Sequence, residues 1–306
     1  NYSKIKDKNK IFKKLKLRGP DITSIIEVNG YIFIHFLLHF CGEVTTQPLY
    51  NKKNEIVLCY NGEIYNYKSF GDYNSDTEMI IEQYMKNGIN DIKNFDGEFT
   101  FVIFDFKKGK IIQSSDIFAT KPQWFYNKNN EIIISSLRSS IHSCLGLENK
   151  FSRDIKNPLI KKNLLINNIK KVEPNQIIIR SLENLKILKS EKVFEFDLNQ
   201  HKDNFDDFNM AFENAIKKRV NLNNFNSSNI GLCLSSGYDS GAISCCLNKF
   251  NMDHYVYSMK CNENMDVLNK RLDLAKNKNF YDLKKETYLE YRQKFQENIE
   301  VTSIKL

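Results

Sequence analysis

The sequence predicts a protein of two parts, an α+β part built mainly from antiparallel strands and then an α/β part. Two observations carry this prediction. In the first two thirds of the chain, apolar runs of strand length alternate with tight turns and with only one or two helical segments. From Phe208 onwards, helices and short strands alternate, which is the order of a parallel sheet with crossover helices. The polar stretch 197–204 is the expected linker.

The first part begins with a basic helix, expected over residues 3–16, which Gly19 and Pro20 end in a turn. An amphipathic helix is expected after a cap within Ser75-Asp76-Thr77-Glu78 and ends at Gly88. The remaining apolar runs predict strands at residues 30–40, 55–60, 99–106, 111–115, 131–136 and 176–180. Strands of this kind, joined by tight turns, favour sheets packed face to face.

The second part centres on residues 229–244. A short apolar strand ends at Leu234, a turn of small residues follows at 235–237, and a helix is expected from Ser240. The N–H groups and the dipole at a helix N-terminus make such a corner an anion site. An ordinary strand–turn–helix corner has the same pattern. Around this stretch we expect a helix over 208–220, a strand over 255–259 and helical structure over 264–298.

The composition is that of a globular protein, with 41% hydrophobic and 27% charged residues. The net charge of +8 comes from lysines spread along the chain, so nucleic acid is not an expected partner. No apolar run is long enough to span a bilayer, and the polar N-terminus does not resemble a signal peptide. We therefore expect no membrane association.

The seven cysteines include no Cys-x-x-Cys pair and do not cluster with the five histidines, so a zinc site is not expected. Cys233, Cys245 and Cys246 lie in apolar segments and are expected to be reduced core thiols, which fits a cytoplasmic protein. The chain starts with Asn1 rather than Met and stops at Leu306, soon after the small-residue turn. A fragment or a processed chain is therefore expected.

Six short motifs occur along the chain. They are Arg18-Gly19-Pro20-Asp21, Thr46-Gln47-Pro48-Leu49-Tyr50, Asn61-Gly62-Glu63-Ile64-Tyr65-Asn66, Ser75-Asp76-Thr77-Glu78, Asp96-Gly97-Glu98-Phe99 and Ser235-Ser236-Gly237-Tyr238-Asp239-Ser240. Each is weak alone, since Asn61-Gly62 after a strand is typical of a type I′ hairpin turn and Asp76 of a plain helix N-cap. Together, in this order and spacing, they resemble the glutamine-hydrolysing asparagine synthetase family over nearly the whole chain.

The resemblance implies two domains. Residues 1–198 correspond to a type 2 glutamine amidotransferase domain, an αββα antiparallel sandwich of the N-terminal-nucleophile type, without its nucleophile segment. Residues 204–306 correspond to the first part of the synthetase domain, a parallel-sheet ATP-pyrophosphatase like the adenine nucleotide α-hydrolases. The implied reaction makes asparagine from aspartate, ATP and ammonia released from glutamine, through β-aspartyl-AMP. The implied cofactors are ATP and Mg²⁺, the implied small-molecule partners are glutamine, aspartate and ATP, and a homodimer is compatible with the family.

By the same resemblance, the glutamine site consists of Asn61, Gly62, Glu63 and Asp76. Hydrolysis of the amide passes through a tetrahedral intermediate, which needs hydrogen-bond donors aimed at its oxyanion. The Asn61 side chain and the Gly62 N–H are the matching donors, and Glu63 backs them. The Asp76 carboxylate matches the group that holds the α-ammonium of the substrate.

The residues that the resemblance assigns to ATP are Leu234, Ser235, Ser236, Gly237, Asp239, Ser240 and Met259. Ser235, Gly237 and Ser240 are expected to bind phosphates, and Ser236 replaces the usual Gly, which is a mild change. Because two anions repel each other, Asp239 is expected to act through Mg²⁺ or through the geometry of the loop. Leu234 and Met259 match positions that line the adenine pocket, although as isolated apolar residues both fit a core.

Three departures from the family concern catalysis. The family nucleophile is an N-terminal Cys, but this chain begins at Asn1, so no catalytic residue is identified and the chain is not expected to hydrolyse glutamine. An alignment through His35 and Gln47 puts Leu37 where the family has an Arg for the glutamine α-carboxylate. The family's second ATP loop would lie beyond Leu306. Two interpretations stay open: an asparagine synthetase fragment, or a divergent protein with an impaired glutaminase site that uses ammonia or only binds ligands.

Overall fold

The computed structural model describes residues 5, 8–40, 43–128, 131–146, 168–199, 202–220, 230–260, 263–282, 286 and 289–291. The chain divides into two compact units, Asn1–Asp197 with Gln296–Leu306, and Leu198–Phe295. We describe each unit by itself. Within the described ranges, no helix combines the length and the apolar character needed to cross a membrane.

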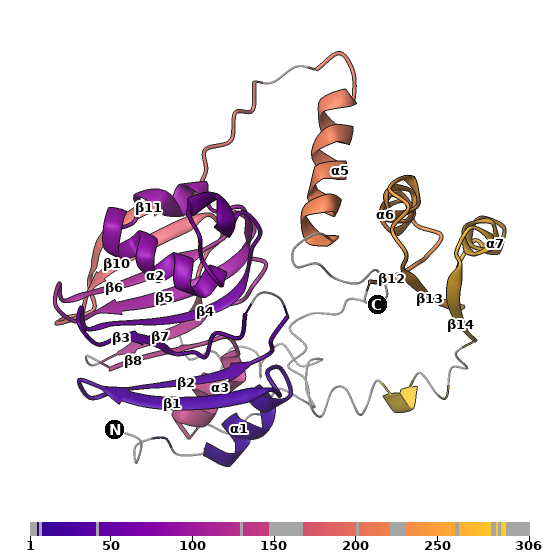
Figure 1. Ribbon diagram of the computed structural model, residues 1–306. Helices are drawn as coiled ribbons and strands as arrows, with labels where there is room; N and C mark the ends of the chain where they lie inside the picture. The colour runs from indigo at the N-terminus through magenta and orange to yellow at the C-terminus, as the bar shows by residue number, and fades with distance from the viewer. Residues whose placement is uncertain are drawn as a thin grey trace. The chain divides into compact units, whose positions relative to one another are not determined.

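A six-stranded sheet forms the centre of the first unit, and all of its neighbouring strands are antiparallel (Figure 1). The strands follow the spatial order β11-β10-β6-β5-β4-β3. Their bounds are β3 (Leu49–Asn51), β4 (Ile56–Ile64), β5 (Gly97–Asp105), β6 (Lys110–Ser115), β10 (Gln176–Ser181) and β11 (Ile187–Lys192).

A second layer of antiparallel strands faces this sheet. It contains the hairpin of β1 (Ile22–Val28) and β2 (Tyr31–Leu37), and a three-stranded sheet in the order β8-β7-β9. The bounds of these three strands are β7 (Trp124–Lys128), β8 (Glu131–Ser135) and β9 (Ile169–Lys171).

Helices cover the outer faces of the two strand layers (Figure 1). Helix α2 (Asp76–Asn87) packs on the six-stranded sheet, close to the 3₁₀ turns η2 (Tyr67–Phe70) and η3 (Asn90–Asn94). Helices α1 (Lys8–Lys16) and α3 (Arg138–Cys144) contact each other beyond the second layer. The four layers form the αββα sandwich that the resemblance predicted.

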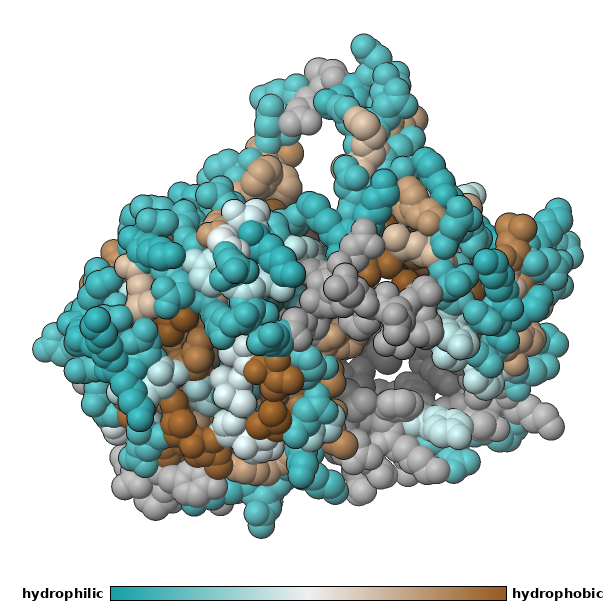
Figure 2. All heavy atoms as spheres, in the orientation of Figure 1, coloured by the Kyte–Doolittle hydropathy of each residue, from teal (hydrophilic) through white to brown (hydrophobic). Residues whose placement is uncertain are grey.

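Alternate side chains of β5 fill the two faces of the six-stranded sheet. Phe99, Phe101 and Ile103 pack with α2, whereas Val102 and Phe104 pack against the β1–β2 hairpin. Hydrophobic side chains are also visible between the two strand layers on the face drawn in Figure 2. Because both faces of β5 are buried, a shift by one residue would exchange the two sets, so the core fixes its register.

The second unit contains a three-stranded parallel sheet in the order β12-β13-β14. Helix α6 connects β12 to β13, and α7 connects β13 to β14, as parallel strands require. One apolar cluster joins helices and strands and includes Leu232, Val256 and Leu268. The bounds are α5 (Asp206–Val220), β12 (Gly231–Cys233), α6 (Tyr238–Lys249), β13 (Tyr255–Lys260), α7 (Met265–Asp273) and β14 (Asn277–Asp282). The predicted alternation of helices and strands is confirmed as far as α7.

The structure corrects several expectations about elements. Strand β14 lies within the stretch 264–298, which the sequence predicted to be helical. It is an edge strand whose polar residues are almost all exposed, so it shows no apolar alternation. The polar edge strand β11 was missed for the same reason, and β1, β3, β7, β9 and α3 were also not predicted. Parts of the helices expected at 3–16 and 264–298 lie outside the described residues.

The predicted burial of the thiols is only partly right. Cys246 is buried, but Cys233 and Cys245 are exposed, and all three are free. Cys233 follows the buried Leu232 in β12 and therefore faces the opposite, uncovered side of the sheet. Cys41 and Cys261 lie outside the described residues.

Two of the three Asn-Gly pairs in the first unit, Asn29-Gly30 and Asn61-Gly62, have different structures. Asn29-Gly30 forms the turn between β1 and β2, with φ angles of 49° and 78°, which is the pattern of a type I′ turn. Asn61-Gly62, for which the sequence left a hairpin turn open, lies inside β4 and pairs with β5 without a break in register. The hairpin interpretation of Asn61-Gly62 is therefore wrong.

We expect Gly62→Ala to destabilise the first unit by about 3 kcal/mol or more, since it combines overpacking with backbone strain. Gly62 has a φ of 147°, and a Cβ there would lie 2.2 Å from the Glu98 carbonyl oxygen. Gly30→Ala is the matched control, because Gly30 also has a positive φ but a Cβ would meet nothing within 4 Å. Its cost should be about 1 kcal/mol. Urea denaturation measures both, and equal losses would contradict the packing argument.

Candidate functional site

Beyond the end of β3, side chains form hydrogen bonds with the edge of β4 that faces away from β5. The β3–β4 register would place Gln47 opposite Tyr60, but Pro48 lacks an N–H, its peptide bond is cis, and β3 begins only at Leu49. The Gln47 side-chain oxygen accepts from the Tyr60 N–H (2.7 Å), and His35 Nε2 donates to the Tyr60 carbonyl (3.2 Å). Two side chains thus satisfy both backbone groups of Tyr60.

The Tyr60 side chain connects this edge to Asp76 at the start of α2. The Tyr60 hydroxyl donates to Asp76 Oδ2 (2.6 Å), and the Ile64 N–H donates to the same oxygen (3.0 Å). The N-cap of α2 is Ser75, whose hydroxyl accepts from the Glu78 N–H (3.2 Å), so the interpretation of Asp76 as a plain N-cap is wrong. Burial raises the pKa of Asp76, and the hydrogen bonds from Tyr60 and Ile64 oppose that rise.

Asn61 and Gly62 lie between these anchored groups in β4. Alternate N–H groups of a strand face the same edge, so the Gly62 N–H faces the edge used by the N–H groups of Tyr60 and Ile64. Asn61 Nδ2 is buried and has no hydrogen-bond partner among the described residues. Glu63 follows in the same strand. The structure therefore brings the four residues assigned to the glutamine site together.

Strand β2 contributes His35 and Leu37 to this region. Burial lowers the pKa of His35, which favours the neutral imidazole. Since the Tyr60 carbonyl can only accept, the ring proton is assigned to Nε2, and Nδ1 is then a buried acceptor without a partner in the described part of the chain. Leu37 is 9% exposed and pairs with Ile22 of β1. Its side chain offers no hydrogen bond to a carboxylate.

In the second unit, the turn of small residues joins β12 to α6. The Ser240 hydroxyl oxygen accepts from the Ser235 N–H (3.0 Å) and lies 2.8 Å from the Ser235 hydroxyl oxygen. The Gly237 N–H donates to the Ser235 hydroxyl oxygen (3.1 Å). Gly237 is the N-cap residue and provides no side-chain cap for the helix. Three residues assigned to the ATP phosphates thus lie in one compact turn.

Two charged residues that the sequence did not predict contact this turn. Glu263 Oε2 accepts from the Ser236 N–H (2.5 Å) and from the Ser236 hydroxyl, and these bonds lower the pKa of Glu263. Arg271 Nη1 donates to the carbonyls of Ser235 (2.7 Å) and Gly237 (2.8 Å). Glu263 follows the carboxyl end of β13, next to the carboxyl end of β12, which is where parallel sheets bind ligands. Only the folded topology reveals these contacts.

The residues assigned to adenine and Mg²⁺ are less closely grouped. Leu234 is buried in the apolar cluster of the second unit, whereas Met259 is 54% exposed, so the core interpretation holds for Leu234 and is wrong for Met259. Asp239 is exposed in the first turn of α6. Among the described residues, no three His, Cys, Asp or Glu side chains gather as a metal-binding group. One carboxylate beside substrate phosphates is nevertheless a common Mg²⁺ arrangement.

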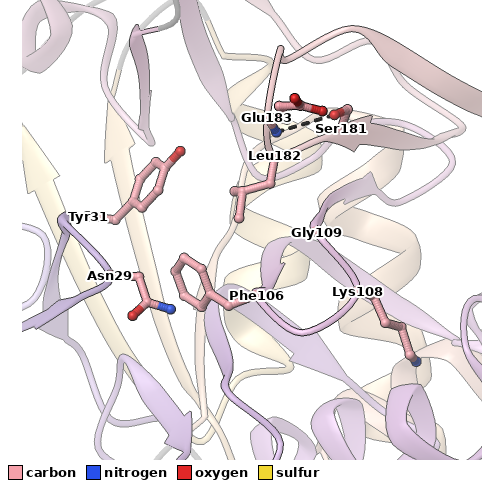
Figure 3. Close-up of a pocket in the computed structure, with 8 residues that line it drawn as sticks. All are labelled: Asn29, Tyr31, Phe106, Lys108, Gly109, Ser181, Leu182 and Glu183. Carbon is pink, nitrogen blue, oxygen red and sulfur yellow. Dashed lines mark hydrogen bonds between the residues drawn. The ribbon is translucent and has the colours of Figure 1, made fainter.

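A shallow pocket lies at the other end of the first unit (Figure 3). Figure 3 shows the side chains of Tyr31, Phe106 and Leu182 lining it from different elements. Strand β5 ends beside this pocket at Asp105, whereas Gly62 pairs near the beginning of β5, so the pocket is separate from the candidate glutamine site. Its volume is about 590 Å³, and its lining residues are Asn29, Tyr31, Phe106, Lys108, Gly109, Ser181, Leu182 and Glu183.

A family model described as "Glutamine amidotransferase domain" matches residues 2–193, which is more than half of the chain. The chain belongs to the glutamine amidotransferase domain family. The matched stretch holds every residue assigned to the glutamine site and none of those assigned to ATP.

Curated relatives of this glutamine amidotransferase chain are asparagine synthetases, which confirms the predicted resemblance. It is 35% identical over 155 residues to putative asparagine synthetase [glutamine-hydrolyzing] 2 of Methanocaldococcus jannaschii, covering 42% of this chain and 30% of the relative. It is 30% identical over 265 residues to the Mus musculus asparagine synthetase [glutamine-hydrolyzing], covering 77% of this chain and 45% of the relative. The chain thus spans less than half the length of these relatives.

One solved structure with likeness to the chain is the glutamine phosphoribosylpyrophosphate amidotransferase from B. subtilis complexed with ADP and GMP. The identity is 15% and the TM-score is 0.35, covering 78% of this chain and 48% of that chain. The fold assignment rests on the layers described above.

The raised pKa of Asp76 predicts a pH dependence of stability that Asp76→Asn removes. The folded unit holds this proton more tightly than the unfolded chain. The resulting stabilisation is therefore present below the unfolded pKa of about 4 and is lost as the pH rises through the raised folded pKa. Relative to the original chain, Asp76→Asn should become more stable to urea as the pH rises from about 4 to 7. Asp72→Asn, at an exposed carboxylate, is the control, and a flat difference for Asp76→Asn would contradict the assignment.

Proposed function

We propose that the first unit binds glutamine and stabilises the transition state of its amide hydrolysis. The main support is the buried Asn61 Nδ2, which has no partner within the described residues, beside the edge-facing Gly62 N–H. A buried donor without a partner costs free energy, so its retention needs an explanation such as a ligand. An oxyanion is a suitable ligand for two adjacent donors, and such a donor contributes about 3 kcal/mol to catalysis in known sites.

Asp76 supplies the charge that the α-ammonium of glutamine requires. Hydrogen bonds from Tyr60 and Ile64 hold its carboxylate beside β4, so little reorientation is needed when the substrate arrives. Burial disfavours the ionised form of Asp76 until a cation is present. An ammonium group would offset this penalty, whereas a neutral amide would not, so Asp76 favours an amino-acid substrate.

In the second unit, we propose that the turn 235–240 binds the phosphates of ATP. The Glu263 carboxylate on the N–H and hydroxyl of Ser236 supports this, because its oxygens have the acceptor chemistry of phosphate oxygens. Ser235, Gly237 and Ser240 supply further polar groups at the N-terminus of α6, whose dipole favours anions. Asp239 is the residue placed to hold Mg²⁺, which would neutralise phosphate charge, and bound ATP would activate a carboxylate by adenylation.

We propose that the complete reaction is glutamine-hydrolysing asparagine synthesis, the reaction in the names of the curated relatives. Ammonia from glutamine would then react with aspartate that ATP has activated, giving asparagine, AMP and pyrophosphate. The two candidate sites on separate units support this division, one for the ammonia donor and one for the nucleotide.

A second candidate function is synthesis from free ammonia with a weakened glutaminase site. The buried Leu37 favours it, because the apolar side chain offers no contact for the glutamine α-carboxylate. Binding measurements on the chain discriminate the two: glutamine affinity in the millimolar range or weaker, with normal ATP affinity, would favour the ammonia-dependent reaction.

Asp76→Asn should weaken glutamine binding about tenfold or more without loss of the fold. The Asn oxygen still accepts from Tyr60 and Ile64, but the negative charge is lost. Isothermal titration calorimetry measures the affinity. Tyr84→Phe is the control: Tyr84 packs in the same core cluster as Tyr60, but its hydroxyl donates to the buried Asp105 (2.8 Å), so its loss should not affect the site. Unchanged glutamine affinity in Asp76→Asn would sink the assignment of this carboxylate.

Ser240→Ala should lower the affinity for ATP about tenfold, because the hydroxyl both orders the turn and can donate to a phosphate. Ser244→Ala, at a buried serine one turn further along α6, is the control and should bind ATP as the original chain does. The measurement is calorimetric titration with ATP in the presence of Mg²⁺. Equal affinities in Ser240→Ala and the control would remove this hydroxyl from the phosphate site.

A further inference from the structure

The geometry points to Arg271 as a positioning residue that aims the backbone donors of the turn 235–240 at a bound phosphate. This inference rests on the proposed binding of ATP phosphates by that turn. Arg271 lies in the last turn of α7, far from the turn in sequence, and Nη1 donates to the carbonyls of Ser235 (2.7 Å) and Gly237 (2.8 Å).

The two carbonyls determine where the next two N–H groups point. In a trans peptide the C=O and the following N–H point in opposite directions. When Arg271 draws the Ser235 and Gly237 carbonyls towards α7, the N–H groups of Ser236 and Tyr238 must point away from α7. Two backbone donors are thereby directed to the side of the turn that is free of the guanidinium.

The two peptides depend on Arg271 to different extents. The Gly237 carbonyl also accepts from the Gly241 N–H (3.3 Å), which is the first hydrogen bond of α6, so the helix itself orients the Tyr238 N–H. The Ser235 carbonyl lies outside the helix, and besides Arg271 it accepts only a long hydrogen bond from the Ser240 hydroxyl (3.4 Å) among the described residues. Arg271 therefore acts mainly on the direction of the Ser236 N–H. Its Nη1 holds the Ser235–Ser236 peptide, which precedes α6, as well as the Gly237–Tyr238 peptide at the start of α6.

Glu263 shows that the Ser236 N–H meets an anion on this side. Its carboxylate accepts from that N–H at 2.5 Å, and from the Ser236 hydroxyl through the same oxygen. A carboxylate oxygen has the charge and acceptor geometry of a phosphate oxygen. The N–H is thus already directed at the kind of group that ATP or pyrophosphate would bring.

Gly241 in α6 makes room for the guanidinium. A Cβ at this position would lie 2.5 Å from the guanidinium carbon of Arg271. The clash would fall on the far end of a flexible side chain, so the guanidinium would move and the helix would remain. This offers a way to displace Arg271 without changing the charge of the protein.

The test compares Gly241→Ala, Arg271→Ala and the double variant in calorimetric titrations with inorganic pyrophosphate and, separately, with ATP. Each single variant should lower both affinities about tenfold, the loss expected when a backbone donor is misdirected. The double variant should bind no more weakly than Arg271→Ala alone, because both changes remove the same contact. Lys270→Ala is the control for charge, since it removes the neighbouring exposed cation of α7, which makes no hydrogen bond to the turn within the described part of the chain.

The outcomes separate positioning from general effects. Weak binding by Arg271→Ala with normal binding by Gly241→Ala would overturn the inference, because charge alone would then explain the loss. Equal losses in Lys270→Ala and Arg271→Ala would also overturn it. Normal binding by both single variants would overturn the inference and leave the proposed ATP site intact. No binding of either ligand by the original chain would overturn the ATP site and the inference with it. Urea denaturation of each variant verifies that the second unit stays folded.

Discussion

The site in the first unit depends on the way β3 stops pairing with β4. If β3 continued towards Pro48 and Gln47, its carbonyls would take up the N–H groups along the edge of β4. Instead the ladder ends at Leu49, and the Tyr60 N–H binds the side chain of Gln47. The Ile64 N–H binds Asp76 further along the edge. Between them the Gly62 N–H faces the same edge, beyond the last β3–β4 pair.

Close contact between two backbones explains the glycines at the same end of the sheet. A Cβ on Gly62 would lie 2.2 Å from the Glu98 carbonyl oxygen, and a Cβ on Gly97 would lie 2.2 Å from the Glu63 carbonyl oxygen. The two strands therefore exclude side chains at this end for reasons of packing. Packing thus explains the glycine in the motifs Asn61-Gly62-Glu63 and Asp96-Gly97-Glu98. A catalytic or binding role in these motifs therefore falls to the neighbouring polar groups.

The parts of the fold that could be predicted are those in which burial produces a recognisable local pattern of apolar residues. Strand β5 is buried on both faces, so its continuous apolar run was recognised. The edge strands β11 and β14 expose most of their side chains and carry polar sequences, so no periodicity marked them. The Asn61-Gly62 pair was ambiguous for a related reason, because its pattern alone does not show whether a strand continues past it.

The same distinction applies to the candidate sites: residues within local motifs could be predicted, and residues brought close by the fold could not. Asn61, Gly62 and Asp76 were found because short motifs contain them. Glu263 and Arg271 were missed, because the contacts that matter join them to residues 27 to 36 positions earlier. A crossover connection in a parallel sheet creates those contacts, and only its three-dimensional geometry determines which side chain reaches the turn.

These contacts also change the meaning of Ser236, which replaces a glycine of the family pattern and looked like a mild change. A glycine would keep the N–H that binds Glu263 but would lose the hydroxyl, which donates to the same carboxylate and accepts from the Asn264 N–H (3.1 Å). The hydroxyl therefore strengthens the hold on an ionised Glu263, whose pKa these bonds lower. Since a carboxylate and a phosphate cannot share one N–H without repulsion, the proposed phosphate binding at Ser236 would require that the phosphate replace Glu263 there. In this chain an internal carboxylate thus holds the N–H and the hydroxyl of Ser236, the groups that the proposal gives to a phosphate.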